Sequence, residues 1–541
     1  MKSAYINGNV YTGQLPVRQA FLVEQGVFRK VGSNGEVLRE ISGEDRVVDL
    51  RGHFVCPGFN DSHMHLLSFG NSLRTLRLAE HSGSLSDMLR YVRSCLEEHP
   101  PGAGQWLLGR GWNQDSFSDV SRMPDRYDLD GISTEVPIML TRACGHCCVV
   151  NTKALEISRI DGNTLSPEGG DVGMRDGRPD GRFYDNAMEL VQRCLPPPGR
   201  EEIRDMLRNA CREVNRYGIT SVQSDDYLVF QGVSWETVQD VLEEMARTGE
   251  LTVRVYEQAQ FTDVKGLEDF LGKGNRTGKG GNMFRIGPVK LLGDGSLGSR
   301  TAYLSRPYAD SDADTRGFPL YSDREMQTMV TCAHSHGMQL AVHAIGDACL
   351  DQILNAMEQA MQAFPRPDPR HGIVHCQITR PDQLRRIRDL GLHVYAQSIF
   401  LDYDNHIVEK RAGKELAGTS YHWKTLMDMG VSVSNGSDCP VELPHVMAGV
   451  ECAVTRTSMD GTGPYLPGEA FSVREALDSY TLRGAEASFE ETVKGQIAPG
   501  FLADFTVLSE NPFDTDPRRL HEISVLLCCL GGKEVYDAHL F

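Results

Sequence analysis

The chain has 541 residues, of which 40% are hydrophobic and 24% are charged, and its formal net charge is -19 at pH 7. This composition is ordinary for a soluble globular protein with several structural units. The acidic charge argues against nucleic acid or an anionic membrane as the main partner. The sequence contains neither a signal peptide pattern nor an apolar run of the ~20 residues that span a membrane. We therefore expect a cytoplasmic protein that acts on a small-molecule substrate.

Both ends of the chain are predicted to form short strands and turns. Near the N-terminus, Ala4 to Ile6 leads into Asn7-Gly8, a pair that is typical of a β-hairpin. Near the C-terminus, the apolar run Val525 to Leu530 precedes two glycines. Each end alone would leave unpaired sheet edges. We therefore expect the two ends to pair into one small β-domain.

The middle of the chain alternates short apolar runs with helical patterns, which is typical of βαβ units and a parallel sheet. The helical pattern is clearest at Asp323 to His336 and at Pro381 to Leu390. Strands that alternate with helices in this way predict an α/β fold with a closed (β/α)8 TIM barrel. The expected strands are Phe54 to Asn60, Ile219 to Gln223, Leu251 to Tyr256, Arg285 to Leu292, Gln339 to Ala344, Gly372 to Cys376, Leu392 to Gln397 and Val431 to Asn435.

The connection after the first expected strand is too long for a βα loop. We therefore expect residues 67–218 to be an insertion with its own structure and connecting helices. Its last part, Glu201 to Tyr217, has the pattern of a barrel helix. Its stretch from Ser166 to Gly181 is rich in glycine and proline and is predicted to be a loop.

Two histidines, His63 and His65, follow the first expected strand. Residues i and i+2 of a strand share a face, so both side chains would point at one metal ion. A His-x-His pair alone also fits a polar loop with incidental histidines. His343, His375 and Asp438 lie at the ends of the fifth, sixth and eighth expected strands, where barrel enzymes have their active sites. Imidazole and carboxylate groups bind zinc and similar divalent cations, so this recurrence favours a metal site.

Lys290 lies in an otherwise apolar fourth strand. Lysine is almost never fully buried without a partner. One interpretation is an interior salt bridge, with Asp294 as the candidate partner. The other is reaction of the neutral amine with CO₂, which gives a carbamate whose anionic oxygens can bridge two metal ions.

With this ligand set, the sequence resembles the amidohydrolase superfamily, and within it the branch that includes N-substituted formamide deformylases. The resemblance extends over essentially the whole chain and includes Gly109 to Trp112, Asp294 to Ala302, and Gly495 to Gly500 with Ala503-Asp504. It implies a metal-binding barrel of residues 57–66 and 219–489. It also implies that residues 1–56 and 490–541 form a composite β-sandwich domain beside the barrel.

The resemblance further implies a role for each ligand position. His63 and His65 would bind the more buried ion, and His343 and His375 would bind a second ion if there is one. A carbamylated Lys290 would bridge them. Asp438 would contact the metal centre and act as the general base. The expected cofactor is a divalent metal, one or two ions, with zinc as the first expectation.

Three residues are weaker candidates for substrate contacts. His146 lies in Cys144-Gly145-His146-Cys147-Cys148, which lacks the second ligand pair of a zinc knuckle. The resemblance places a substrate-facing histidine in this segment, although Cys144 stands where the family has an aspartate. Trp112 either forms a pocket wall or packs inside the insertion, and Arg300 either binds a substrate carboxylate or forms a structural ion pair. Some polar residues have no motif support and are expected to be ordinary packing or surface residues. They are Asp225, Asp226, His334, His336, His371, His393 and His406.

The expected reaction is hydrolysis of a non-peptide C–N bond in an amide, a formamide or a cyclic amide. A deaminase or an ester or lactone hydrolase would use the same metal site, because loops select the substrate of such barrels. A third alternative is a non-catalytic, amidohydrolase-like assembly protein, which the intact ligand positions disfavour. Barrels of this kind often dimerise, so a homodimer is a further expectation that the sequence does not test.

Overall fold

The computed structural model of the chain describes residues 2–102, 104–143, 146–167, 169–311 and 314–540. The chain divides into two compact units, each of which is described by itself. The first unit comprises Met1–Phe69, Ile203–Val229 and Ser234–Phe541, and the second comprises Gly70–Glu202 and Phe230–Val233. Among the described residues, no helix is both long and apolar enough to cross a lipid bilayer.

The first unit contains an 8-stranded parallel sheet whose strands follow one another in chain order. Its first and last strands are also neighbours, because the backbone N–H of Asp438 donates to the carbonyl of His63 at 2.8 Å. The sheet is therefore a nearly closed barrel, as predicted. Its strands are β7 Phe59–Met64, β14 Ile219–Ser224, β15 Arg254–Gln260, β16 Phe284–Leu292, β17 Leu340–Ala344, β18 Gly372–His375, β19 His393–Ala396 and β20 Val433–Asn435.

Helices connect the barrel strands, and their starts carry clear capping signals. Ser234 accepts a hydrogen bond from the N–H of Thr237, and Ser322 forms a reciprocal capping box with Glu325. The helices predicted at Asp323 to His336 and at Pro381 to Leu390 are confirmed as α10 and α12. The helices of the barrel are α7 Arg200–Arg216, α8 Trp235–Thr248, α9 Val264–Gly272, α10 Asp323–Ser335, α11 Asp347–Ala363, α12 Pro381–Asp389, α13 Leu401–Asp404, α14 Val408–Ala417, α15 Trp423–Asp428, α16 Val446–Thr455, α17 Val473–Ser479 and α18 Leu482–Ala487.

The first barrel strand differs from the prediction. The run from Phe54 to Asn60 forms parts of two strands, because β6 (Phe54–Pro57) belongs to a different sheet from β7. Gly58 separates them and lies tightly against the next strand, since a Cβ atom there would lie 2.3 Å from Thr220 Oγ1. The Pro57-Gly58 pair, a turn signal, is the mark of this change of sheet in the sequence.

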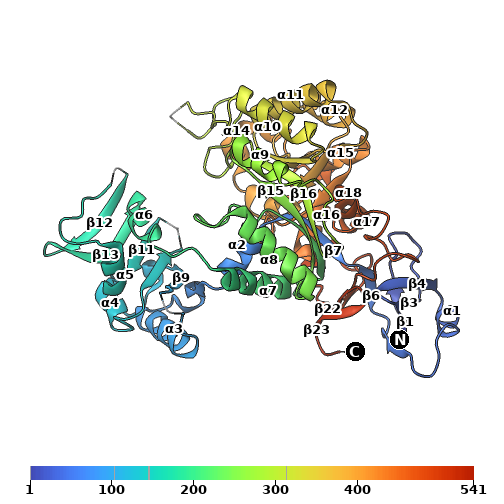
Figure 1. Cartoon of the computed structure of the whole chain (residues 1–541), viewed down its shortest axis with the longest axis horizontal. Helices are drawn as coiled ribbons and strands as arrows, with labels where there is room; N and C mark the ends of the chain where they lie inside the picture. Colours follow the sequence, from blue (N-terminus) through green and yellow to red (C-terminus); the bar gives the residue numbers. More distant parts are fainter. Residues whose placement is uncertain (1, 103, 144–145, 168, 312–313, 541) are drawn as a thin grey trace. The chain divides into compact units, whose positions relative to one another are not determined.

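The two ends of the chain, blue and red in Figure 1, contribute to two small sheets with a shared apolar core. Tyr5 and Phe21 of one sheet each lie 4.9 Å from the ring of Phe505 in the other. These sheets group with the barrel in the first unit, so a separate β-sandwich domain remains a prediction. The strand order of the first sheet is β4 Val27–Gly32, β3 Ala20–Glu24, β1 Lys2–Ile6 and β5 Arg46–Asp49. The strand order of the second sheet is β2 Asn9–Val10, β6, β21 Phe505–Leu508, β22 Val525–Leu530 and β23 Lys533–Asp537.

Two turn predictions are wrong. Asn7-Gly8 does not close a hairpin, because β1 and β2 lie in different sheets. Within the stretch from Ser166 to Gly181 that was predicted to be a loop, the residues from Gly170 onward form a hairpin, with strands β12 (Gly170–Arg175) and β13 (Arg178–Asp185). Its turn is Asp176-Gly177, whose φ angles of 51° and 73° fit a two-residue hairpin turn. Glycine content indicated a loop, whereas the Asp-Gly pair was the more informative signal.

The second unit contains a 6-stranded sheet in the order β12-β13-β11-β10-β9-β8. Apolar side chains from its strands and helices form two clusters, one of which includes Trp112 and the other Phe183. The insertion therefore has its own core. Its other elements are β8 Leu76–Arg77, α3 Leu85–Glu98, β9 Leu107–Trp112, α4 Arg126–Asp130, β10 Ile138–Arg142, β11 Cys147–Val150, α5 Thr152–Ser158 and α6 Glu189–Gln192.

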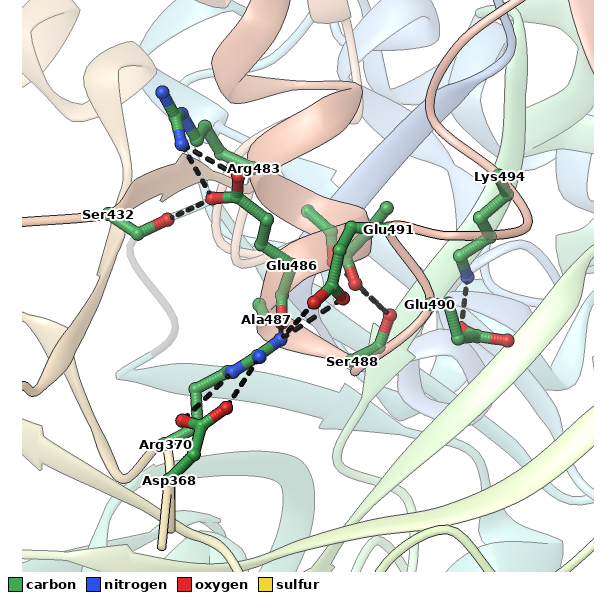
Figure 2. A network of polar contacts seen from close by, with 12 residues as sticks. Asp368, Arg370, Ser432, Arg483, Glu486, Ala487, Ser488, Glu490, Glu491 and Lys494 are labelled. Carbon is green, nitrogen blue, oxygen red and sulfur yellow. Dashed lines mark hydrogen bonds and ion pairs between the residues drawn. The ribbon is translucent and has the colours of Figure 1, made fainter. Parts of the chain in front are cut away.

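The C-terminal end of α18 lies against the N-terminal end of the barrel. Ala487 packs against side chains of β17, β18 and β19, and its carbonyl accepts a hydrogen bond of 2.9 Å from Gln339. Figure 2 shows the surrounding polar network, in which Arg370 lies between the carboxylates of Asp368 and Glu491 at 2.7 and 3.1 Å. Contacts at this end of such barrels serve stability, so the chemistry is expected at the opposite end.

Candidate metal centre

The predicted ligand side chains gather at the C-terminal end of the barrel strands. His63 lies near the end of β7, His343 in β17 and His375 at the end of β18. The ring centroids of His63 and His65 are 5.3 Å apart, those of His63 and His375 are 5.8 Å apart, and those of His343 and His375 are 4.5 Å apart. The structure thus brings together histidines that are up to 312 residues apart in the chain, from position 63 to position 375.

A carboxylate lies against two of these rings. Asp438 Oδ1 is 3.3 Å from His63 Nε2 and 3.1 Å from His65 Nε2. The candidate ligand atoms of these three residues all lie within 4.8 Å of one another. The side chains of His63 and Asp438 are 1% and 10% exposed, and that of His65 is 27% exposed. The cluster is therefore buried on one side and accessible on the other.

The backbone around this cluster adopts conformations that favour glycine. His375 and Asp438 have φ angles of 70° and 56°, in the left-handed region that non-glycine residues rarely occupy. Such conformations are concentrated at functional sites. Gly436 allows the end of β20 to approach β7, because a Cβ atom there would lie 2.5 Å from the backbone nitrogen of His63.

Hydrogen bonds on the far side of the rings fix their proton positions. His63 Nδ1 lies 2.7 Å from Gln258 Oε1, and His375 Nδ1 lies 2.7 Å from Gln397 Oε1. The amide nitrogen of each glutamine donates to a carbonyl, so each oxygen faces its histidine. His65 Nδ1 donates to the carbonyl of Asp225 at 3.1 Å. Nδ1 therefore carries the proton in these rings, and their Nε2 lone pairs remain available to a metal.

The donor set fits a divalent cation. Imidazole lone pairs and a carboxylate that converge at these distances repel one another unless a cation or a proton lies between them. Nitrogen and carboxylate oxygen ligands in a partly open cluster are those of catalytic zinc sites. His63, His65 and Asp438 would hold such an ion, and His343 and His375 would contribute from the adjoining side.

The pKa shifts of the cluster also indicate that it needs a positive charge. Burial alone would raise the pKa of Asp438, but its close contacts with the rings of His63 and His65 hold it well below its usual range. Burial lowers the pKa of His63 to about 4 and that of His375 well below its usual value. Burial also acts to lower the pKa of His65, but its hydrogen bond with Asp438 raises it to about 9. Without a metal ion, a proton shared by His65 and Asp438 supplies the positive charge.

Lys290 lies beside this cluster with a different partner from the one expected. Its side chain is 1% exposed, and its Nζ lies 3.4 Å from Asp225 Oδ2 rather than near Asp294. Sequence reasoning missed Asp225, which follows β14 at the same end of the barrel and also supplies the carbonyl that orients His65. Its position after a barrel strand was the signal that could have identified it.

The weaker candidates have other partners. Trp112 is completely buried in the core of the insertion, where its Nε1 donates to the carbonyl of Leu140 at 3.0 Å, which favours packing over a pocket wall. Arg300 forms an ion pair with Asp310 at 3.0 Å, which favours the structural role. His146 is largely exposed and pairs with Asp185 at 3.0 Å. Cys144 and Gly145, on which the zinc-knuckle comparison depends, lie outside the described residues.

Comparisons with known proteins agree with this architecture. The sequence model of the Amidohydrolase family matches residues 46–536. The putative amidohydrolase YtcJ of Bacillus subtilis is 32% identical over 99% of this chain and 100% of its own length. The N-substituted formamide deformylase of Arthrobacter pascens is 27% identical over 98% of both chains. An uncharacterized metal-dependent hydrolase from Pyrococcus horikoshii superposes with a TM-score of 0.78 at 28% identity and covers 96% of this chain and 99% of its own.

A barrel with clustered histidines and a carboxylate at the C-terminal ends of its strands defines a metal-dependent hydrolase site. The chain belongs to the amidohydrolase family. It is accordingly a hydrolase, and the resemblance inferred from its motifs is confirmed.

Proposed function

We propose that this protein hydrolyses a non-peptide C–N bond, in an amide, a formamide or a cyclic amide, with a divalent metal and Asp438 as the general base. The observation that carries the proposal is the position of the Asp438 carboxylate, within 3.3 Å of Nε2 of both His63 and His65. Full-length similarity to a protein named N-substituted formamide deformylase supports the choice of a C–N bond.

Each residue of the centre has a proposed task. His63, His65, His343, His375 and Asp438 hold the metal, with Lys290 as a further ligand if it is carbamylated. A bound divalent metal would supply a Lewis acid and lower the pKa of coordinated water to roughly 7. Asp438 accepts the proton of the attacking water and delivers it to the leaving nitrogen, so that the amine departs neutral. The pKa of Asp438 lies well below its usual range, so the carboxylate is ionised, as a proton acceptor must be.

Several finer points belong to the same proposal. Zinc is the metal that the nitrogen and oxygen donors favour. A carbamate on Lys290 would require the amine to leave Asp225, which lies 3.4 Å away. His146 remains the candidate substrate contact of the insertion. A location in the cytoplasm and a homodimeric state are proposed from the sequence alone.

A substrate screen with an Asp438→Asn variant tests the proposal. Metal-reconstituted enzyme is assayed against N-formyl amines, N-acyl amines, cyclic amides, amidines, esters and lactones. We expect turnover of at least one amide class. Asp438→Asn is expected to retain metal but to lose roughly 100- to 10,000-fold in kcat, because proton transfer contributes that much. Asp389→Asn, at an exposed carboxylate that pairs with Arg388, is the matched control.

Two results would contradict the proposal. Turnover of esters, lactones or amidines without any amide would refute the choice of bond and leave the metal site intact. A kcat for Asp438→Asn within about tenfold of the wild-type value would refute the role of Asp438 as the base.

A further inference from the structure

Asp294 is a buried carboxylate whose motif the proposed reaction leaves unexplained. It begins the glycine-rich stretch Asp294 to Ser299, in the long connection between β16 and α10. Its side chain is 0% exposed. Oδ2 accepts hydrogen bonds of 2.8 Å from the backbone N–H groups of Tyr303 and Gly346, and Oδ1 accepts one of 3.1 Å from Ile345. The carboxylate therefore joins its own loop to the loop that follows β17.

The two loops are packed so closely that they leave little freedom to move. A Cβ atom at Gly295 would lie 2.1 Å from Thr301 Oγ1, and one at Gly346 would lie 2.0 Å from the carbonyl oxygen of Tyr303. Real Cβ atoms do not approach other atoms so closely, so glycine is required at both positions. The motif thus builds a rigid support at the end of β17, the strand that carries His343.

This support contacts the ring of His343 on one nitrogen. His343 Nε2 lies 3.2 Å from Asp294 Oδ1 and 3.1 Å from the carbonyl oxygen of Gly295. Both neighbours are acceptors, so Nε2 carries the proton and Nδ1 carries the lone pair. His63, His65 and His375 show the opposite arrangement, with Nδ1 facing an acceptor. The motif therefore fixes the proton position of the His343 ring, as Gln258 does for His63 and Gln397 does for His375.

We propose that Asp294 is a positioning residue that holds the His343 ring with Nε2–H directed at the Gly295 carbonyl and against the Asp294 carboxylate, and with Nδ1 directed at the metal centre. This inference rests on the proposed function, in which His343 is a metal ligand. A carboxylate at the outer nitrogen increases the basicity of the inner one, and such partners commonly strengthen metal binding by about 10- to 100-fold. A purely structural Asp294 would instead stabilise the loops without acting through the ring.

The test compares metal binding by Asp294→Asn and Asp310→Asn, titrating metal-free protein with Co²⁺ and recording the visible spectrum. Asp310 lies in the same connection, is partly exposed and pairs with Arg300 and Arg411. We expect Asp294→Asn to weaken binding of the ion held by His343 by about 10- to 100-fold and to change its absorption band. We expect Asp310→Asn to leave both unchanged. An unchanged affinity and spectrum in Asp294→Asn would overturn the inference.

A double-mutant cycle separates positioning from simple loop stability. If Asp294 acts through the ring, Asp294→Asn causes no further loss of affinity in a His343→Ala background. Equal losses in both backgrounds would show that the carboxylate only supports the loops and would refute the inference. If His343→Ala alone leaves the number and affinity of bound ions unchanged, then the ligand set of the proposed function fails, which is a distinguishable result.

One measurement on the unmodified protein covers the case in which Asp294→Asn does not fold. Nitrogen-15 spectra of histidine-labelled, metal-free enzyme report which ring nitrogen carries the proton, and the His343 signal is assigned by its loss in His343→Gln. We expect the Nε2-protonated form for His343 and the Nδ1-protonated form for His375. A His343 ring protonated at Nδ1 would overturn the inference.

Discussion

At the scale of single residues, the site depends on groups that hold the ligand rings from behind. His63 and His375 each present Nε2 to the centre because a glutamine oxygen 2.7 Å away accepts the proton of Nδ1. An imidazole ring without such a partner can rotate or change tautomer, and either change removes the lone pair from the metal. The glutamines are therefore expected to matter for metal affinity as much as for stability.

Replacing Gln397 by leucine should test this dependence. The change removes the acceptor for His375 Nδ1, and we expect metal affinity to fall by about 10- to 100-fold. Gln352→Leu is a suitable control, because Gln352 is a largely buried glutamine on α11 that bonds to Tyr321 and Asp323 instead. Competition with a chromogenic chelator measures both affinities. Equal affinities for the two variants would contradict the role of Gln397.

The sequence allowed the prediction of those residues whose position relative to a strand end is diagnostic. His63, His65, His343, His375 and Asp438 meet that condition. Gln258 lies within β15 and Gln397 directly follows β19. Neither belongs to a motif, and the role of each follows only from a histidine that is 195 or 22 residues away. Asp225 also follows a barrel strand, but no motif includes it, and its contact with Lys290 appears only in the structure.

At the scale of elements, the site forms where the last barrel strand meets the first. Ser437 donates its backbone N–H and its hydroxyl to Asp61, and Asp438 donates its N–H to His63. This close approach is possible because Gly436 has no side chain. The carboxylate of Asp438 therefore reaches His63 and His65 only if β20 and β7 remain in contact.

Substitution of Gly436 by alanine should separate these strands. Its Cβ would lie 2.5 Å from His63 N and 2.7 Å from Asp61 Oδ1, so the backbone must shift. We expect a loss of about 1–3 kcal/mol in the free energy of unfolding, as is typical of overpacking, together with weaker metal binding. Gly272→Ala, at the end of α9 where a Cβ meets nothing within 4 Å, should leave both unchanged. Urea unfolding measures the stability of the two variants, and metal titration measures their affinity. Equal stability and equal affinity in the two variants would contradict this account.

Most helices and strands were predictable because their hydrophobic periodicity is strong. The strand with which each strand pairs was not predictable. The run from Phe54 to Asn60 contains Pro57-Gly58, a turn signal at the point where the chain changes sheet, but its apolar residues favoured a single strand. Asn7-Gly8 has the composition of a hairpin, yet β1 pairs with β3 and β5, which lie further along the chain. Pairing over long sequence distances depends on packing, which local patterns do not describe.

At the scale of the whole molecule, buried histidines make stability depend on pH. Burial lowers the pKa of His393 to about 3 and that of His371 well below its usual value. In the unfolded chain both would titrate near 6.5. Below that pH the unfolded state binds protons that the folded state does not, so the free energy of unfolding decreases as the pH falls from 6.5 toward 3.

The His393 contribution can be measured separately. Between pH 8 and pH 5, we expect His393 to account for a loss of about 2 kcal/mol in the free energy of unfolding. His393→Gln should lose less stability over this interval than the wild type, whereas His336→Gln, at an exposed position, should match the wild type. Urea unfolding of metal-free protein at both pH values gives the comparison. A pH dependence in His393→Gln equal to that of the wild type would contradict the prediction.

The central claim is that the barrel brings its histidines and Asp438 to one metal ion. Anomalous X-ray scattering at the zinc edge, from crystals grown with Zn²⁺, tests it most directly. We predict a strong anomalous peak within coordination distance of His63 Nε2, His65 Nε2 and an oxygen of Asp438. Crystals that bind Zn²⁺ only elsewhere on the molecule, with no peak among these residues, would contradict the account.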